Sequence, residues 1–259
     1  MIGFLIKKTF FDAWDNLFAL LAVNLIYGVI CAVPVVVFFL LRESVTLIMM
    51  LVLILSALAL LSFHSLGASA LSGKWSCYRK GGVKSYFNAI RNHFRHALVY
   101  FIIYSFIVLS FLFILPSYFS TGTPGGTIIG LVLLWVSVLL LLSSQFYFPL
   151  CILMEKDGPF KTLKKSFIVL GDNMLYAVFL ALRSIIDTVL TLATLSLVPG
   201  LGGINLSRTD TMKLIMLRYD YMDSNNIKDK KQISWSEILY NDRNAIGHRS
   251  LKDMFFPWR

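Results

Sequence analysis

Acidic residues are scarce in this chain of 259 residues. It has 14 aspartates and glutamates against 24 lysines and arginines, and none of the acidic residues lies between Glu43 and Glu155. Charged residues of both signs make up only 15% of the chain, whereas a soluble domain has about a quarter. Hydrophobic residues make up 57%. A soluble fold could not bury that much apolar surface, so an ordinary soluble domain is excluded.

Cysteine and recognisable catalytic motifs are also nearly absent. The three cysteines, Cys31, Cys77 and Cys151, are scattered without a CxxC pair, which excludes a disulfide framework. The chain has no GxSxG, HExxH, phosphate-binding loop or paired-carboxylate arrangement. We therefore expect no enzyme activity and no cofactor. The N-terminus lacks a small-residue cleavage site after a short apolar core, so we do not expect a removable signal peptide.

Long apolar runs dominate what is present. Several approach or exceed the roughly 20 residues that a helix needs to cross the hydrocarbon layer. We predict an all-α fold, a polytopic membrane helical bundle with five clear spans and a sixth, over 1–222, and a cytoplasmic tail over 223–259. The spans are expected at 17–41, 45–66, 97–117, 127–150, 173–197 and 204–222.

A pattern that occurs three times organises these spans. A lysine, a serine or threonine and an aromatic residue are followed by an asparagine at 8–16, 84–92 and 165–173. Each copy runs into an apolar segment that begins at or just after the asparagine. The pattern predicts three pseudo-repeated hairpins, each entered through a lead-in helix that lies in the membrane interface.

The third hairpin is the unusual one. Its apolar stretch from Phe167 to Val198 would be about 48 Å long as one helix, so we expect a break at 171–173, with Asp172 capping the helix that follows. The segment 204–222 mixes apolar residues with charges and is typical of an amphipathic surface helix. The repeat and the basic tail favour instead a return crossing, which would leave both termini in the cytoplasm.

Arg183 and Asp187 lie one helical turn apart inside the fifth predicted span. Ionisable residues at that depth cost at least about 2.5 kcal/mol on insertion scales, so they face the bundle interior, water or an opposite charge. One interpretation is a structural ion pair, and the other is a site for a solute or an ion. Asn24, His64 and Gln145 could add polar groups to such a site, although each alone is typical of an interhelical hydrogen bond.

His93 and His96 stand three residues apart, which would place them on one side of a helix, as metal ligands require. The sequence offers no well-spaced third ligand, so no metal site is expected, and interfacial or lipid-facing histidines are the favoured interpretation.

Basic residues flank the spans, where topology and anionic lipid head groups account for them better than nucleic acid does. We expect lipid head-group contact at Lys74, Arg79, Lys80 and Lys84. In the tail, Ser234 and Glu237 fit a capping box that starts a short helix, which Gly247 ends. Four aromatic residues of the tail are expected to dock on the membrane surface, on the cytoplasmic face of the bundle or on a partner; they are Trp235, Phe255, Phe256 and Trp258.

The chain resembles the YesL-type bacterial membrane protein family, a group of unknown function, over roughly 1–222. The resemblance rests on DAWDNL at 12–17, YFNAIR at 86–91, FPL at 148–150 and LKKS at 163–166. It implies a bacterial inner-membrane location and an association with carbohydrate uptake, but no catalytic residue. The tail from Trp235 to Arg259 departs from the short family pattern.

Two functions follow from these expectations, and a third, a lipid-modifying enzyme, is disfavoured because the chain lacks an acid–base or nucleophile constellation. The leading hypothesis is a non-enzymatic accessory or scaffold component of a transport system in the bacterial cytoplasmic membrane. Its partners would be the lipid bilayer and a membrane transporter subunit or a cytoplasmic protein, without nucleic acid. The alternative is a small-solute or ion transporter with a site around Arg183 and Asp187.

Overall fold

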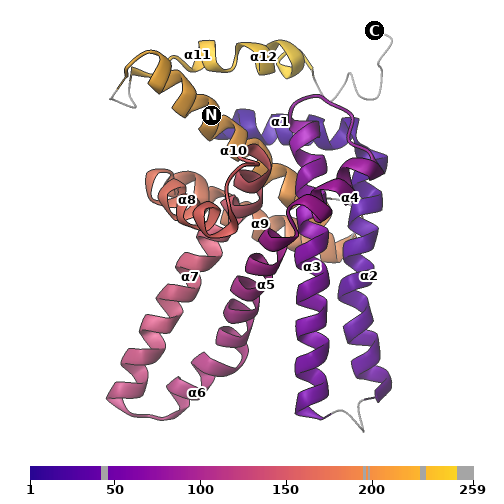
Figure 1. Cartoon of the computed structure of the whole chain (residues 1–259), viewed down its shortest axis with the longest axis vertical. Helices are drawn as coiled ribbons and strands as arrows, with labels where there is room; N and C mark the ends of the chain where they lie inside the picture. The colour runs from indigo at the N-terminus through magenta and orange to yellow at the C-terminus, as the bar shows by residue number, and fades with distance from the viewer. Residues whose placement is uncertain (42–45, 195–196, 198, 228–231, 250–259) are drawn as a thin grey trace.

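The computed structural model describes residues 1–41, 46–194, 197, 199–227 and 232–249, which form helices and turns without a strand. Two long hairpins, α2–α3 and α5–α7, run in one direction, and shorter helices cover one end (Figure 1). The predicted all-α helical bundle is confirmed. The helices are α1 (Ile2–Asp15), α2 (Leu17–Leu41), α3 (Leu47–Ser76), α4 (Val83–Asn92), α5 (Phe94–Leu109), the π-helix η1 (Ser110–Ile114), α6 (Leu115–Ser120), α7 (Pro124–Leu153), α8 (Pro159–Asp172), α9 (Met174–Ala193), α10 (Gly200–Ser224), α11 (Trp235–Ile238) and α12 (Tyr240–Ile246).

Five segments are long and apolar enough to cross a membrane: α2, α3, the continuous segment Phe94–Ser120, α7 and α9. They carry large apolar side chains on the outside of the bundle, such as Phe18, Leu40 and Trp135, with exposed fractions of 88%, 77% and 65%. Keeping one such side chain in water instead of burying it costs about 1.5–3 kcal/mol. These faces therefore contact lipid hydrocarbon, and the chain is a membrane protein.

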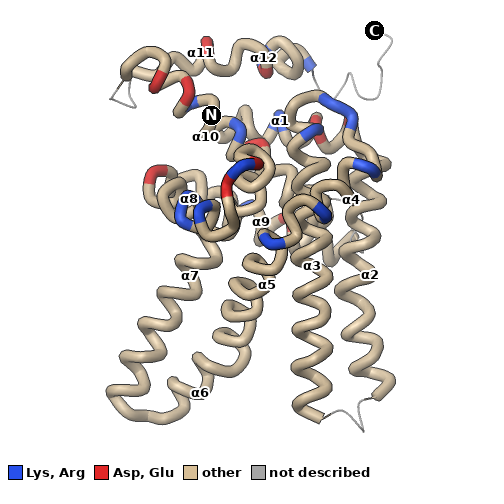
Figure 2. The backbone as a smooth tube through the Cα atoms, in the orientation of Figure 1, with Lys and Arg blue, Asp and Glu red and all other residues tan. Residues whose placement is uncertain are grey.

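Charged residues gather at one end of the bundle. Figure 2 shows lysine, arginine, aspartate and glutamate around α1, α4, α8 and α10–α12, whereas the lower parts of α2, α3 and α7 are uncharged over the residues drawn in colour. This distribution separates a polar end from a hydrocarbon-embedded end, as the flanking basic residues predict.

The second span is longer than expected. We predicted its end at 66, but α3 continues to Ser76. Small residues follow Leu66, and a Cβ atom at Gly67 would overlap the ring of Tyr86 in α4. The drop in hydropathy therefore reflects close packing of α4 against α3 and not the start of a loop.

Three helix breaks lie where the repeated pattern predicts entry into the bilayer. The breaks are at Asn16, His93 and Asn173, with φ of −118°, −117° and −132° and ψ of 25°, 24° and 37°. The side-chain amides of the two asparagines donate to the carbonyls of Asp12 and Val169 at 2.9 and 3.0 Å. Each asparagine thus uses its side chain to end one helix and redirect the chain into the next.

Two details of these breaks differ from expectation. In the second copy the break falls one residue after Asn92, at His93. In the third copy Asn173, and not Asp172, stands at the start of α9, and it makes no side-chain cap hydrogen bond there. Asp172 instead accepts a hydrogen bond from Tyr219 at 3.1 Å, because α10 packs beside this break.

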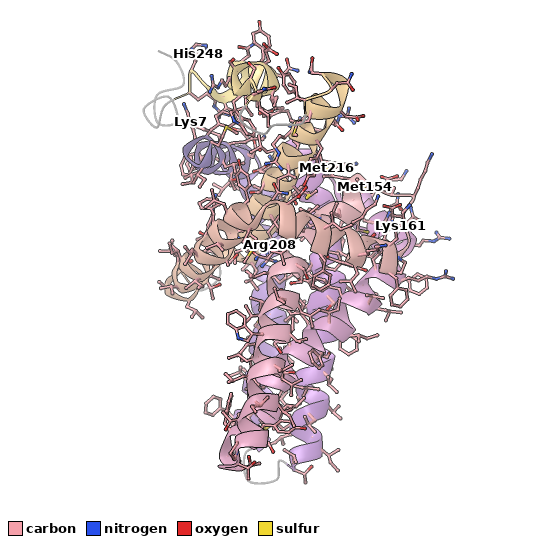
Figure 3. The ribbon with its side chains drawn as sticks, turned by 90° about the vertical axis from the view of Figure 1, so that its left-hand side faces the viewer. Lys7, Met154, Lys161, Arg208, Met216 and His248 are labelled. Atoms are coloured by element: carbon pink, nitrogen blue, oxygen red, sulfur yellow. The ribbon has the colours of Figure 1, made fainter. Side chains whose placement is uncertain are left out.

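The α9–α10 hairpin ends inside the bundle. Asn24 of α2 donates to the carbonyls of Leu197 and Pro199 at 2.8 and 3.0 Å and accepts from the amide of Gly202 at 2.9 Å. Asn24 lies only about 10 Å along α2 from Leu17. Figure 3 shows this hairpin pointing sideways and ending well above the tips of the two long hairpins.

The crossing predicted over 204–222 is therefore not found in the expected form. α10 is absent from the five apolar segments, and it runs from the level of Asn24 back to α1, which it contacts. Its polar residues are covered by neighbouring helices, since Asn205, Thr209 and Asp210 are all buried.

The described part of the tail folds back over α1. Leu239 is buried with Leu5 and Leu214, and Trp235 packs against them. Ser234 precedes α11 but makes no capping hydrogen bond. The predicted capping box is wrong, because the carboxylate of Glu237 accepts from the hydroxyl of Tyr221 at 2.7 Å instead.

Candidate functional site

A polar helix at the centre of the bundle is the main feature around which a site is built. α10 contacts α1, α2, α3, α7 and α9. Gly200 begins it with φ of +66°, and a Cβ atom there would overlap the side chain of Asn24. A second close approach occurs at Gly202, also against Asn24. The glycines thus let α10 lie directly on α2 and bring its polar side chains inside.

Arg208 extends from α10 into a cavity of about 210 Å³ between α2, α3, α5, α9 and α10. Figure 3 shows it at mid-height, between the charged end and the tips of the hairpins. The polar residues that line the cavity with it are Tyr27, Ser62, Ser65, Tyr100, Tyr104, Ser184, Thr188 and Asn205.

A second cavity, of about 340 Å³, adjoins the same arginine between α5, α7, α9 and α10. Tyr104, Ser184, Thr188 and Arg208 line both cavities. Gln145 lines only the second. Arg208 therefore borders two cavities within the bundle, and the second is lined largely by apolar side chains such as Leu141, Ile185 and Val189.

Tyrosines surround the arginine. Tyr104 is a hydrogen-bond partner of Arg208, and its ring stacks on that of Tyr100 with centroids 4.5 Å apart. Asn205, nearly one turn before Arg208, donates to the hydroxyl of Tyr27 at 2.6 Å. These contacts hold the hydroxyl groups around the cavity in place, so the site is preorganised.

Arg208 has no carboxylate counter-ion among the residues that the structure describes. None of these residues that line either cavity is an aspartate or glutamate, and the Nε atom of Arg208 has no hydrogen-bond partner among them. A guanidinium group stays protonated in proteins, and a buried unpaired charge is costly. The arrangement fits a ligand that brings a negative charge.

Arg183 and Asp187 form the ion pair that their spacing predicts. The Nε atom of Arg183 lies 3.4 Å from a carboxylate oxygen of Asp187, and the side chains are 19% and 11% exposed. Neither residue lines the two cavities at Arg208. The geometry favours the structural interpretation over a site at this pair.

The other predicted polar residues separate into different roles. Asn24 holds the α9–α10 turn. His64 donates from Nε2 to the carbonyl of Val23 at 3.0 Å, which leaves Nδ1 to accept from Tyr86 at 2.6 Å. Gln145 alone reaches the cavities, and its Oε1 atom is buried without a hydrogen-bond partner among the described residues.

The predicted head-group residues Lys74, Arg79, Lys80 and Lys84 are all exposed around the α3–α4 connection. Their position leaves the expected contact with anionic lipid as a prediction. In the tail, Trp235 is half-buried against Leu5, Leu214 and Leu239, and its docking on a partner stays a prediction. The remaining predicted docking residues lie outside the described residues; they are Phe255, Phe256 and Trp258.

A buried charge cluster joins α1, α3 and α10 at the polar end. The ammonium group of Lys8 lies 2.6 Å from Asp12 and 3.8 Å from Asp210, and it donates to the carbonyl of Ser76 at 3.1 Å. Lys8, Asp12 and Asp210 are each at most 2% exposed. Burial lowers the pKa of Lys8, but Asp210 and Asp12 outweigh it, so the net pKa is raised.

The same cluster reaches the tail. Asp242 of α12 accepts from Tyr78 at 2.9 Å and from Lys213 of α10 at 3.1 Å. Burial, followed by the nearby charge of Asp210, raises the pKa of Asp12 to about 8. The cluster fastens α10 and the tail to the first helix, and thereby sets the position of Arg208.

Sequence reasoning missed the residues at the centre of this site. In the sequence, Arg208 is one of several charges in an amphipathic segment. Tyr27, Tyr100 and Tyr104 lie within apolar runs, where nothing local distinguishes them as site residues. The spacing of Asn205, Arg208 and Thr209 on one polar stretch was the available signal. The chain matches no protein-family model, no curated protein and no solved structure at a significant level.

Proposed function

We propose that this protein binds a small anion at Arg208 inside the membrane and moves it across as a small-solute transporter. The observation that carries the proposal is a half-buried arginine whose covered Nε atom has no hydrogen-bond partner, and which borders two cavities without an aspartate or glutamate among their described lining residues. A carboxylate or phosphate group would supply the missing negative charge, and its planar or tetrahedral oxygens suit the donors of arginine.

The architecture supports transport rather than simple storage of a ligand. Transporters commonly have repeated helical units, and their sites lie near mid-membrane beside helices that do not cross completely. Here a re-entrant hairpin carries Arg208 to the centre of the bundle, and similar helix breaks precede three hairpins. Two cavities that share Arg208 give a bound anion space beside the guanidinium group, which supports the proposal.

Thermal unfolding of the detergent-purified full chain tests the proposal. The probes are acetate, succinate, inorganic phosphate and a short-chain phosphatidylglycerol. A ligand that binds only the folded state stabilises it by about 2.7 kcal/mol at 100 times its Kd. We expect a raised Tm with at least one soluble anion for the native chain and none for Arg208→Gln. A response to phosphatidylglycerol alone would identify a lipid head group, which replaces solute transport with lipid binding.

Two variants serve as controls. Arg79→Gln removes an exposed arginine and should leave the anion response unchanged. Tyr104→Phe removes one hydroxyl group that both cavities share and should weaken it about tenfold. The proposal is wrong if no anion stabilises the native chain more than Arg208→Gln. If an anion raises the Tm of the native chain, its uptake into liposomes that contain the protein then tests transport.

An accessory role in a transport system is the second proposal. It is favoured by the basic residues Lys74, Arg79, Lys80 and Lys84, which are all exposed around the α3–α4 connection. Purification from native membranes should recover a membrane transporter subunit with the native chain and lose it when the four residues become glutamine. An unchanged set of co-purifying proteins would contradict this role.

We also propose that the charged end faces the cytoplasm of a bacterial cell, as the excess of basic residues and the resemblance to the YesL-type family favour. The N-terminal helix and the described part of the tail meet at this end, since Leu239 packs on Leu5. Reporters fused before Met1 and after Arg259 should both give a cytoplasmic signal. An external signal from either would contradict the orientation.

A further inference from the structure

Two histidines and a cysteine converge where α4, α5 and α7 meet. One ligand atom from each of His93, His96 and Cys151 lies within 4.8 Å of the others, which makes them the one such group of three or more metal-ligating side chains that the described residues contain. The sequence supplied the histidine pair but no third ligand. Helix packing provides it, because α7 brings Cys151 beside the first turn of α5.

The helix break at His93 sets this geometry. His93 is the residue at which α4 turns into α5, and His96 follows in the first turn of α5. Their rings meet edge to face with centroids 5.6 Å apart. His96 and Cys151 are buried, with exposed fractions of 6% and 0%, so His96 is not the lipid-facing histidine that the sequence favoured.

One side of this group of three residues is buried in the protein, and the other borders a cavity. Tyr147 lies one turn before Cys151, packs against His96 and is fully buried. His93 lines a cavity of about 420 Å³ that also includes Glu155. The histidine and thiolate ligands can therefore hold an ion on the protein side, and water or the carboxylate of Glu155 can complete the coordination from the cavity.

We infer that His93, His96 and Cys151 form a binding site for a divalent transition-metal ion of borderline softness, with Zn²⁺ as the best fit. Imidazole and thiolate ligands select such ions over Mg²⁺ and Ca²⁺. A tetrahedral zinc site separates its ligand atoms by about 3.5 Å, so these side chains need to move by only about 1 Å. The bound ion fixes the α4–α5 break to α7.

Cobalt binding to the full chain in detergent tests the site, after treatment with a chelator. Co²⁺ is a spectroscopic substitute for Zn²⁺, and a thiolate ligand gives it a charge-transfer absorption in the near ultraviolet. We expect one ion per chain, this absorption band, and its loss when Zn²⁺ is added. Loss of an outer partner already weakens metal binding by about 10–100-fold, so Cys151→Ser and His96→Gln should weaken it by at least about 100-fold.

The chain offers matched controls in its other two cysteines. Cys77→Ser and Cys31→Ser should keep the absorption band, since neither residue belongs to the group. A native chain without the band, or a Cys151→Ser variant that keeps it, would overturn the inference. The native chain gives a second measurement that does not depend on variant folding. Zn²⁺ should raise its Tm while Mg²⁺ leaves it unchanged, and equal responses to both ions would also overturn the inference.

Discussion

The ammonium group of Lys8 lies 3.8 Å from the carboxylate of Asp210, and this contact joins the first helix of the chain to the helix that carries Arg208. Asp12 shares the same ammonium group at 2.6 Å. All three side chains are almost completely removed from solvent. Such a cluster costs desolvation energy when it forms, but it is strongly destabilising to break. Its geometry therefore specifies how α1 and α10 fit together.

Replacing Lys8 by methionine should destabilise the fold by about 3 kcal/mol, because it leaves Asp12 and Asp210 buried without their shared cation. Unfolding in a denaturing detergent measures the loss. Lys84→Met is the matched control, since Lys84 is exposed and its loss should change stability by less than about 0.5 kcal/mol. Equal stabilities of the two variants would contradict the structural role of Lys8.

The stability of the fold should depend on pH through Asp12. Burial, and then the charge of Asp210, raises its pKa from 3.8 to about 8 in the folded chain. Because the folded state binds this proton more tightly, the stabilisation is complete below about pH 4 and is lost as the pH rises to about 8. The Tm of the native chain should thus fall relative to that of Asp12→Asn across this range.

Thermal unfolding of the two proteins at a series of pH values checks this prediction. The variant keeps the shape of the side chain but cannot titrate. Lys8, Asp210, Lys213 and Asp242 face the same cluster and are present in both proteins, so the difference between the two curves reports Asp12 together with its interactions with them. Parallel curves would mean that Asp12 does not carry the pH dependence.

A pair of glycine substitutions should have opposite effects. Gly200 has φ of +66°, and a Cβ atom would overlap Asn24. Gly200→Ala should therefore cost at least about 2 kcal/mol and shift the α9–α10 hairpin away from α2. Gly171 lies within α8 with no atom within 4 Å of an added Cβ. Gly171→Ala should stabilise the chain by about 0.5–1 kcal/mol. The free energies of unfolding of the two variants check this prediction. A Gly200→Ala variant as stable as the native chain would contradict the close approach of Gly200 to Asn24.

The Arg183–Asp187 pair should prove structural. Arg183→Met and Asp187→Leu each leave one partner alone, whereas the double variant removes both charges. The double variant should be more stable than the sum of the two single effects predicts. It should also keep the anion-dependent rise in Tm that Arg208→Gln loses. If a folded double variant lost that rise in Tm, the binding site would include Arg183 and Asp187.

Local composition was sufficient for much of the architecture. The apolar runs predicted five helices that can cross a membrane, because a helix in lipid must satisfy its backbone groups internally and present apolar side chains outward. The asparagine pattern located the breaks at Asn16 and Asn173, since an asparagine amide can compete for a backbone carbonyl within the chain's own turn. Both features depend on residues close together in the sequence.

Only the tertiary structure decided where the chemistry lies. The polar sequence of α10 is compatible with a surface helix, and its burial depends on Asn24, which holds the turn from another hairpin. Arg208 meets its tyrosines, Lys8 meets Asp210, and Cys151 joins the two histidines only when distant helices pack. Hydropathy reports the average preference of a segment for lipid or water. It carries no information on which polar side chain a neighbouring helix will cover. The packing of neighbouring helices over these polar side chains is what brings them together as sites.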